Sequence, residues 1–212
     1  MVRPFNASKG LSSPRYLEDQ PNDPKSLRLR GIRADTIRKT SACWTGPTAY
    51  GLGTTGDADD FVNAMSEWLR GLIRLAEGSG NDKKAVWKTA STDRVIDKSL
   101  TWRRLEHYPL GILDDLTGDR ALEALKDSFT RSTPHRAAEE RRAFVTVSGR
   151  LGIGPKHLRD GDAIVVLSGV DVPFILREHS DVCEVIGEAY VDGIMDGETK
   201  GSKFEMESFL LM

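Results

Sequence analysis

The sequence is poor in cysteine, with only Cys43 and Cys183 among its 212 residues. Small secreted domains that depend on disulfides usually carry more cysteines, so this count predicts a reducing environment, and we expect a cytoplasmic protein. Residues 1–10, MVRPFNASKG, lack the apolar core of a signal peptide. The apolar run at residues 163–167 is far shorter than the roughly 20 residues that a membrane helix needs. We therefore expect no membrane span.

The chain also lacks an excess of charge of either sign. It has 30 Lys and Arg residues against 32 Asp and Glu residues, which gives a net charge of −2. Nucleic-acid-binding domains often show a strongly basic balance, so the composition predicts no nucleic-acid partner. Hydrophobic residues make up 39% of the chain and charged residues 29%, which indicates a core beneath a highly charged surface. The length fits one domain, or one domain with an appendage.

The N-terminal residues 1–26 hold four of the nine prolines and little apolar sequence. Such a segment buries too little apolar area to offset the entropy of ordering, so we expect a flexible lead-in that docks at most loosely onto the body. Residues 27–33 alternate apolar and charged side chains, which predicts a half-buried strand. Gly31 indicates a bulge or a close backbone approach within that strand. The following segment, ADTIRKTSACW, favours no single type of structure.

A mainly helical insertion is predicted over residues 57–142. Residues 57–77 place apolar side chains at three- and four-residue spacing after an acidic first turn, which is the pattern of an amphipathic helix. Shorter helices are expected at residues 83–90, 120–129 and 135–142.

Residues 143–210 carry short apolar runs separated by Gly, Pro and Asp turns. Residues 163–167 are apolar throughout, so we expect a central strand buried on both faces. Antiparallel strands with tight turns lose their exposed edges when the sheet closes. We therefore predict an α+β fold for residues 27–212 as a single domain. Its β part is a small, mostly antiparallel β-barrel or curled sheet at residues 143–210, completed by the strand at residues 27–33.

A glycine cluster, Gly149, Gly152 and Gly154, lies just before Pro155. Its spacing differs from the dinucleotide-binding fingerprint, and no suitable helix is predicted to follow it. We expect these glycines to form a tight turn between strands, and we predict no cofactor.

Six carboxylates gather in the same region: Asp160, Asp162, Glu188, Asp192, Asp196 and Glu198. Two carboxylates at a barrel rim could perform acid–base chemistry or bind a divalent cation. Asp160, Asp192 and Asp196 are each followed by glycine, however, which is ordinary turn chemistry. We therefore expect structural roles, in which Asp162 and Asp196 bind local backbone amides. The alternative is a carboxylate-dependent enzyme, or a small ligand-binding barrel, that uses Asp162, Glu188, Asp196 and Glu198. Two of these groups converging within about 5–9 Å in a pocket would support that alternative.

The remaining candidates for chemistry give weaker signals. The histidines His107, His135, His157 and His179 lack the paired spacing of metal ligands, so we predict no metal site. Cys183 falls on the apolar side of a predicted strand, where a buried thiol is the usual outcome. Trp68 and Trp87 fit core positions on helices, whereas Trp102, followed by two arginines, could form a surface contact.

Four blocks follow one another in the C-terminal part of the chain. They are GIGP at residues 152–155, GDAIVVL at 161–167, PFILR at 173–177 and GEAYVDGIMDGE at 187–198. Their order and spacing resemble the C-terminal region of fungal heterokaryon incompatibility proteins, the HET-domain family. With weaker similarity upstream, the resemblance covers roughly residues 27–210. It implies a role in non-self recognition after hyphal fusion, in programmed cell death or in signalling similar to innate immunity.

The resemblance also marks a set of signature residues to which it assigns no individual role. They are Gly154, Pro155, Asp162, Pro173, Arg177, Glu188, Tyr190, Met195, Asp196 and Glu198. Only 26 residues precede the first matched strand, so we expect the chain to lack the HET effector module. Our first hypothesis is a non-catalytic recognition or regulatory module that contacts an unidentified protein partner through its sheet surface or near Trp102. The sequence leaves the oligomeric state open.

Overall fold

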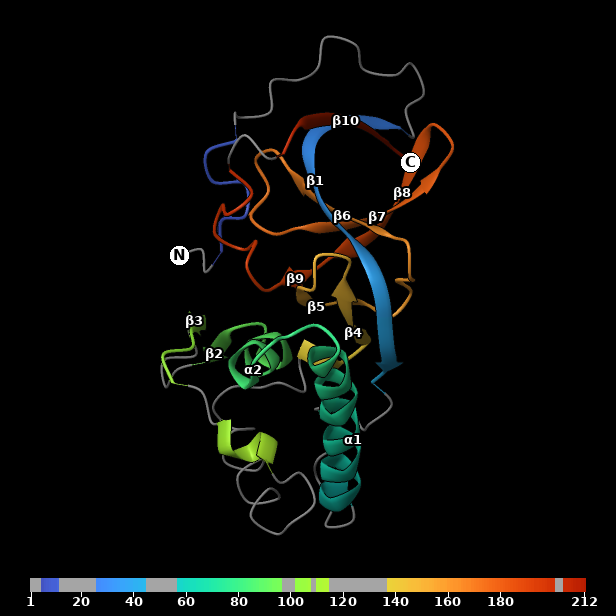
Figure 1. Cartoon of the computed structure of the whole chain (residues 1–212). Coiled ribbons are helices and arrows are strands. Elements are labelled where there is room, and N and C mark those ends of the chain that lie inside the picture. The colour runs from blue at the N-terminus through green and yellow to red at the C-terminus, as the bar shows by residue number, and fades with distance from the viewer. Residues whose placement is uncertain are drawn as a thin grey trace.

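The computed structural model describes residues 5–11, 26–44, 57–96, 102–107, 110–114, 137–200 and 204–212. A curled sheet forms one part of the molecule, and helices α1 and α2 lie against it (Figure 1). The helical elements are α1 (Asp57–Glu77), α2 (Lys83–Ser91) and a short 3₁₀ helix η2 (Leu110–Asp114). The strands are β1 (Leu27–Cys43), β2 (Arg94–Ile96), β3 (Trp102–Arg104), β4 (Arg141–Thr146), β5 (Leu151–Pro155), β6 (Ala163–Leu167), β7 (Phe174–His179), β8 (Val182–Glu188), β9 (Tyr190–Val191) and β10 (Met206–Leu211).

Strand β1 organises the sheet because it pairs with three other strands. Its first part pairs with β10 and β6, and its last part pairs with β4, in each case antiparallel. From β6 the pairing continues through β7 and β8 to β10, so β1, β6, β7, β8 and β10 form a closed circuit (Figure 1). Strands β4, β5 and β9 extend the sheet from the other end of β1. The predicted curled, mostly antiparallel sheet with a helical insertion is therefore confirmed.

The first strand is longer than predicted, and it runs to Cys43 instead of Arg33. Register shifts between Arg33 and Asp35 and again beyond Ile37 bend the strand from one set of partners to the next. Gly31 lies where the backbones of β1 and β6 approach closely, since a Cβ there would be 2.8 Å from the Val166 carbonyl oxygen. The close approach predicted at this glycine is thus confirmed.

Strand β6 is buried on both faces, as predicted. On one face Val165 packs with Phe209 of β10, in an apolar cluster to which all five strands of the circuit contribute. On the other face Ile164 packs in a second cluster with Phe144 of β4. The inside of the circuit is therefore filled with side chains.

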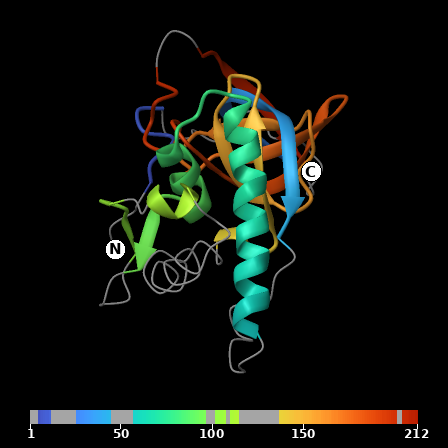
Figure 2. The same cartoon turned by 60° about the horizontal axis from the view of Figure 1, so that its bottom comes forward.

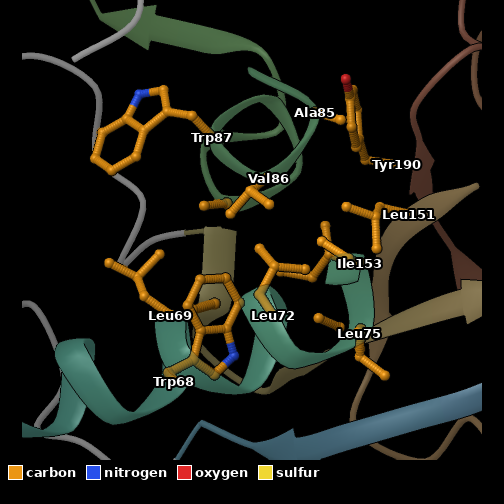
Figure 3. Close-up of a cluster of buried hydrophobic side chains, with 14 of the residues drawn as sticks. Trp68, Leu69, Leu72, Leu75, Ala85, Val86, Trp87, Leu151, Ile153 and Tyr190 are labelled. Atoms are coloured by element: carbon orange, nitrogen blue, oxygen red, sulfur yellow. The ribbon is translucent and has the colours of Figure 1, made fainter. Parts of the chain in front are cut away.

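Helix α1 lies along the sheet beside β1 and β4 (Figure 2). Its apolar stripe, which includes Trp68 and Leu72, faces α2 and the outer side of β5 (Figure 3). Asp82 caps the N-terminus of helix α2, and its carboxylate accepts a hydrogen bond of 2.8 Å from the Ala85 amide. Trp68 and Trp87 are both buried, as their helical spacing predicted.

Two further helices were predicted in the insertion. The helix expected at residues 120–129 lies outside the described residues. The helix expected at residues 135–142 is wrong at its end, because Arg141 and Arg142 belong to β4. Arg142 pairs with both Cys43 and Gly154, and this pairing on two sides outweighs the helical propensity of the local sequence.

The prediction that the three glycines form a tight turn is wrong for two of them. Gly149 does adopt a turn conformation, with φ of 89°. Gly152 and Gly154, in contrast, lie within β5, where they leave room for core side chains. A Cβ at Gly152 would be 2.3 Å from the Phe144 ring, and one at Gly154 would be 2.5 Å from Ile175 Cδ1. Their role is therefore packing within a strand.

Residues 5–11, which belong to the predicted lead-in, pack against the body. The Asn6 amide donates to the Met195 carbonyl at 2.9 Å, and the Ala7 amide donates to the Asp171 carbonyl at 3.0 Å. Phe5 is buried against the ring of Tyr190, with 5.9 Å between ring centroids. Among the described residues, no helix is long and apolar enough to cross a membrane.

Candidate recognition site

The ten signature residues divide among three places, and the first is an ion pair between Asp162 and Arg177. Arg177 Nε and Nη2 lie 2.9 Å from the two Asp162 carboxylate oxygens, and the Asp162 side chain is only 4% exposed. Asp162 also accepts a hydrogen bond of 2.7 Å from the Arg159 amide, so its predicted contact with a local amide is confirmed. Hydrogen bonding to Asp162 raises the pKa of Arg177. This pair fastens the turn before β6 to β7.

The second place joins β5 to the end of β8. A Cβ at Gly187 would lie 2.8 Å from Cγ of Pro155, so the proline ring packs closely over that glycine. Pro173 is buried, and its carbonyl accepts a hydrogen bond of 2.9 Å from the Ala189 amide. Glu188 is exposed beside these contacts. Apart from Glu188, this group therefore serves packing.

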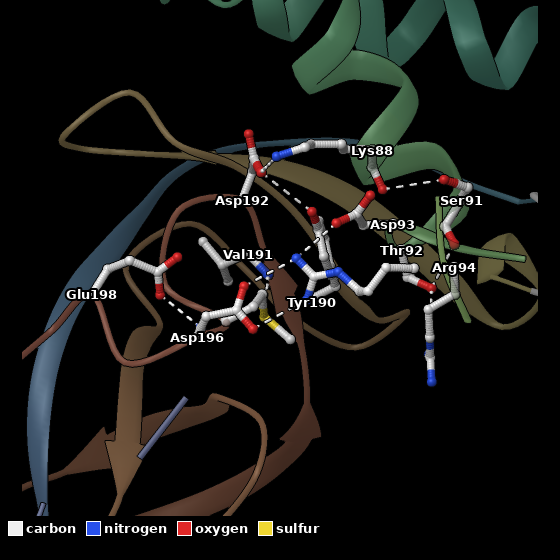
Figure 4. A network of polar contacts seen from close by, with 12 residues as sticks. Lys88, Ser91, Thr92, Asp93, Arg94, Tyr190, Val191, Asp192, Asp196 and Glu198 are labelled. Carbon is white, nitrogen blue, oxygen red and sulfur yellow. Dashed lines mark hydrogen bonds and ion pairs between the residues drawn. The ribbon is translucent and has the colours of Figure 1, made fainter. Parts of the chain in front are cut away.

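The third place is the junction between the sheet, α2 and the β2–β3 hairpin (Figure 4). The Tyr190 ring is buried, and its hydroxyl donates to Asp192 Oδ1 at 3.3 Å. Burial raises the pKa of Tyr190, so its phenol stays neutral. Asp192 also meets Lys88 of α2 at 3.3 Å. These contacts bind the end of β9 to helix α2.

The segment after β9 carries Met195, Asp196 and Glu198. Met195 Sδ accepts a contact of 3.4 Å from the Val191 amide, and Glu198 Oε2 accepts a hydrogen bond of 2.6 Å from the Asp196 amide. The Asp196 carboxylate was predicted to bind a local backbone amide. It binds the Arg104 guanidinium instead, at 3.0 and 3.2 Å, because the β2–β3 hairpin brings that arginine across from the insertion.

Arg104 lies at the centre of this junction. Its Nη2 is 2.8 Å from Asp93 Oδ2, and its guanidinium carbon is 4.7 Å from the centre of the Phe5 ring. Burial opposes the charge of Arg104, but the carboxylates of Asp93 and Asp196 outweigh it and raise the pKa of Arg104. Thr92 and Asp93 have left-handed backbone, with φ of 52° and 51°. Such non-glycine conformations persist only where surrounding contacts enforce them.

Two further arginines border the junction, and neither was predicted. Arg94 lies between two aromatic rings, 5.2 Å from the centre of Phe5 and 5.3 Å from the centre of Trp102. Arg141 begins β4, and its backbone carbonyl accepts from the Trp44 amide at 3.2 Å. Burial lowers the pKa of both arginines, and the charge of Arg141 adds to this effect at Arg94. Trp102 itself is 38% exposed, which is compatible with a surface contact.

The sequence carried only part of the signal for this site. Trp102 with the arginine at residue 104 was recognisable as a candidate contact, because an exposed aromatic beside basic residues is unusual in a core. Arg94 and Arg141 belong to no motif and are distant in sequence from each other. Only the packing of the hairpin and of Phe5 gives Arg94 its position, and Arg141 is close enough for its charge to act on Arg94.

Three of the four carboxylates of the alternative hypothesis take separate partners, and the fourth, Glu188, is exposed. Asp162 contacts Arg177, Asp196 contacts Arg104, and Glu198 caps the Asp196 amide. Within the described ranges, no three His, Cys, Asp or Glu side chains are grouped so that they could hold a metal. A cleft of about 320 Å³ lies between the end of β1 and α1, and none of these carboxylates lines it. The geometry thus indicates binding and packing roles for these groups.

The comparisons with known proteins agree with this architecture. Residues 119–212 match the family described as the Het-6 beta-barrel domain. Over 81 residues the chain is 41% identical to the heterokaryon incompatibility protein 6, OR allele, of Neurospora crassa. This match covers 36% of the chain but only 12% of that protein, and no solved structure matches significantly. The resemblance inferred from the sequence blocks is confirmed: over residues 119–212 this chain is similar to the Het-6 beta-barrel domain family, and over 81 residues it is similar to a heterokaryon incompatibility protein.

Proposed function

We propose that this chain is a non-catalytic recognition or regulatory module of a heterokaryon incompatibility protein. The observation that carries the proposal is the family match at residues 119–212. The module takes part in non-self recognition after hyphal fusion and in the cell-death signalling that follows, and it works in the cytoplasm.

Action by binding is supported by the state of the acidic side chains. Asp162 and Asp196 are each engaged by an arginine, and Glu198 is engaged by a backbone amide. The strand circuit is filled by apolar residues such as Val165, Leu176 and Phe209. A carboxylate-dependent enzyme, or a barrel with an interior ligand, has no corresponding support among the described residues.

The junction around Trp102 is the surface that best suits a protein partner. Arginine and tryptophan dominate the binding energy of protein interfaces, because they combine large apolar area with directed hydrogen bonds. Arg94 and Trp102 present this combination, with the arginine stacked on the exposed indole. The ion pairs of Arg104 hold the surface in place from beneath.

Hyphal fusion tests the proposal. The chain is expressed in one strain of an incompatible pair and, separately, in one strain of a compatible pair, and dead fusion cells are counted with a vital dye. We expect the fraction of dead cells to change several-fold in the incompatible pair and to stay constant in the compatible pair. A variant with Gly152→Val, which cannot pack against Phe144, is the inactive control. An unchanged fraction in both pairs would contradict the proposal.

A further inference from the structure

The side chain of Arg94 is fixed in position by neighbouring residues. Phe5 and Trp102 fix its guanidinium at 5.2 and 5.3 Å, and its Nε donates to Thr92 Oγ1 at 3.2 Å. No carboxylate among the described residues lies within ion-pair distance of it. The terminal nitrogens of this positioned side chain therefore keep hydrogen-bonding capacity for a ligand.

Arg141 resembles Arg94 in one respect, which is the lack of an acidic partner among the described residues. It is half-buried at the start of β4, where the Arg141–Pro155 pairing fixes its backbone. In the part of the chain that the structure describes, its guanidinium has no carboxylate in contact. Arg104, Arg150 and Arg177, in contrast, meet Asp93, Asp35 and Asp162 at 2.8, 3.1 and 2.9 Å. Half-buried guanidiniums without an acidic partner cost stability, so a function is a reasonable cause for their retention.

The charges around the two arginines define what they would bind. Glu188 is the acid whose charge acts on both, and it is exposed. The positive charges of Arg141 and Arg104 both act on Arg94, so the surroundings of Arg94 favour an anion. A carboxylate matches the planar fork of a guanidinium and binds it through paired hydrogen bonds. The exposed part of Trp102 offers an apolar contact beside that position.

We propose that Arg94 and Arg141, together with Trp102, form the docking site for an acidic segment of a partner protein. A glutamate or aspartate of that segment is bound by the two guanidiniums, and its neighbouring residues lie against the indole of Trp102. The inference rests on the proposed function, since it names the kind of partner that the recognition module takes.

The test uses the purified full chain, labelled with ¹⁵N, and a short soluble peptide of alternating Glu and Ser residues. NMR follows the Arg94 Nε–H and Trp102 Nε1–H signals during titration. We expect saturable shifts of both signals with the Glu peptide and none with a matched Gln peptide. Arg94→Gln and Arg141→Gln each weaken binding by about tenfold or more, as expected for the loss of a charge-assisted hydrogen bond. Arg94→Lys keeps the charge without the fork and retains part of the affinity.

The control is Arg30→Gln, which removes one exposed positive charge on β1 and leaves binding unchanged. Equal shifts with the Glu and Gln peptides, or unaltered affinity in the Arg94→Gln and Arg141→Gln variants, would overturn the inference. So would competition by inorganic phosphate at the same concentration as the peptide, because the site would then accept any oxyanion. A positive fusion assay together with a negative titration would overturn the docking site alone. A negative fusion assay together with a positive titration would overturn the proposed function.

Discussion

Asp93 and Arg104 form an ion pair whose carboxylate is almost completely buried. Arg104 Nη2 lies 2.8 Å from Asp93 Oδ2, and the Asp93 side chain is 3% exposed. Asp93 follows α2 in left-handed backbone, and Arg104 ends β3, so the pair fastens the β2–β3 hairpin to the helix. Asp196 binds the same guanidinium from the segment after β9. One arginine thus joins three segments beneath the proposed docking surface.

Replacing Arg104 should therefore destabilise the protein. Arg104→Gln removes the arginine that contacts the buried Asp93 carboxylate, which costs up to about 3 kcal/mol of unfolding free energy, with some discount for the partial exposure of Arg104. Urea unfolding measures the loss. The double variant Asp93→Asn/Arg104→Gln should lose less than the two single variants summed, because the two side chains interact. Additive losses would show that the pair is not a stabilising contact.

Replacing Arg141 should have the opposite outcome. Burial lowers the pKa of Arg141, which means that the fold disfavours its charged form. Removing that charge relieves a desolvation cost, so Arg141→Gln should leave the unfolding free energy unchanged or raise it by up to about 1 kcal/mol. The matched variant Arg30→Gln, at an exposed position, should show no change. A loss as large as that of Arg104→Gln would mean that Arg141 is structural and that its binding role is doubtful.

Gly152 should not tolerate even alanine. An added Cβ would lie 2.3 Å from the Phe144 ring and 2.8 Å from the Tyr190 carbonyl oxygen. Gly152→Ala should lower the unfolding free energy by about 2–3 kcal/mol, and Phe144→Leu in the same chain should restore part of it. Gly78→Ala is the control, because no atom lies within 4 Å of its added Cβ. Equal melting temperatures for the two alanine variants would show that β4 and β5 pack differently.

Asp35 should make stability depend on acid pH. Its side chain is 6% exposed, and it accepts hydrogen bonds from Ser148 Oγ and from the Thr36 amide at 2.9 Å. Burial alone would raise the pKa of Asp35, but these hydrogen bonds outweigh it and lower the pKa below the usual 3.8. The carboxylate therefore stabilises the fold above about pH 4, and this contribution disappears as the pH falls through the lowered pKa. Unfolding titrations should show a shallower acid slope for Asp35→Asn, and an identical slope would refute this.

The part of the fold that could be predicted from the sequence is the part in which buried residues follow a regular pattern along the chain. Strand β6 could be placed because all of its residues are apolar, and both of its faces are indeed buried. The strand beginning at Leu27 could not be followed beyond Arg33. Its register shifts at Asp35 and after Ile37 break the two-residue period that identifies a strand.

Predictions from the sequence were also wrong where one residue type can serve two structural roles. Gly152 and Gly154 suggested a turn, yet they give space to Phe144 and Ile175 inside a sheet. Asp196 suggested a local turn contact, yet it binds Arg104 across 92 residues of sequence. Contacts that depend on long-range packing leave no local pattern, and the pairing of Arg94 with the Phe5 and Trp102 rings is of this kind.

The most direct test of recognition by this module is the fusion assay with the double variant Arg94→Gln/Arg141→Gln. The variant is first shown by circular dichroism and thermal unfolding to be folded like the wild type. It is then expressed in one strain of an incompatible pair, and dead fusion cells are counted beside strains that express the wild-type chain or Arg30→Gln. We predict that wild type and Arg30→Gln change the fraction of dead cells alike, whereas the double variant has no effect. A folded double variant that acts like the wild type would contradict recognition through this surface.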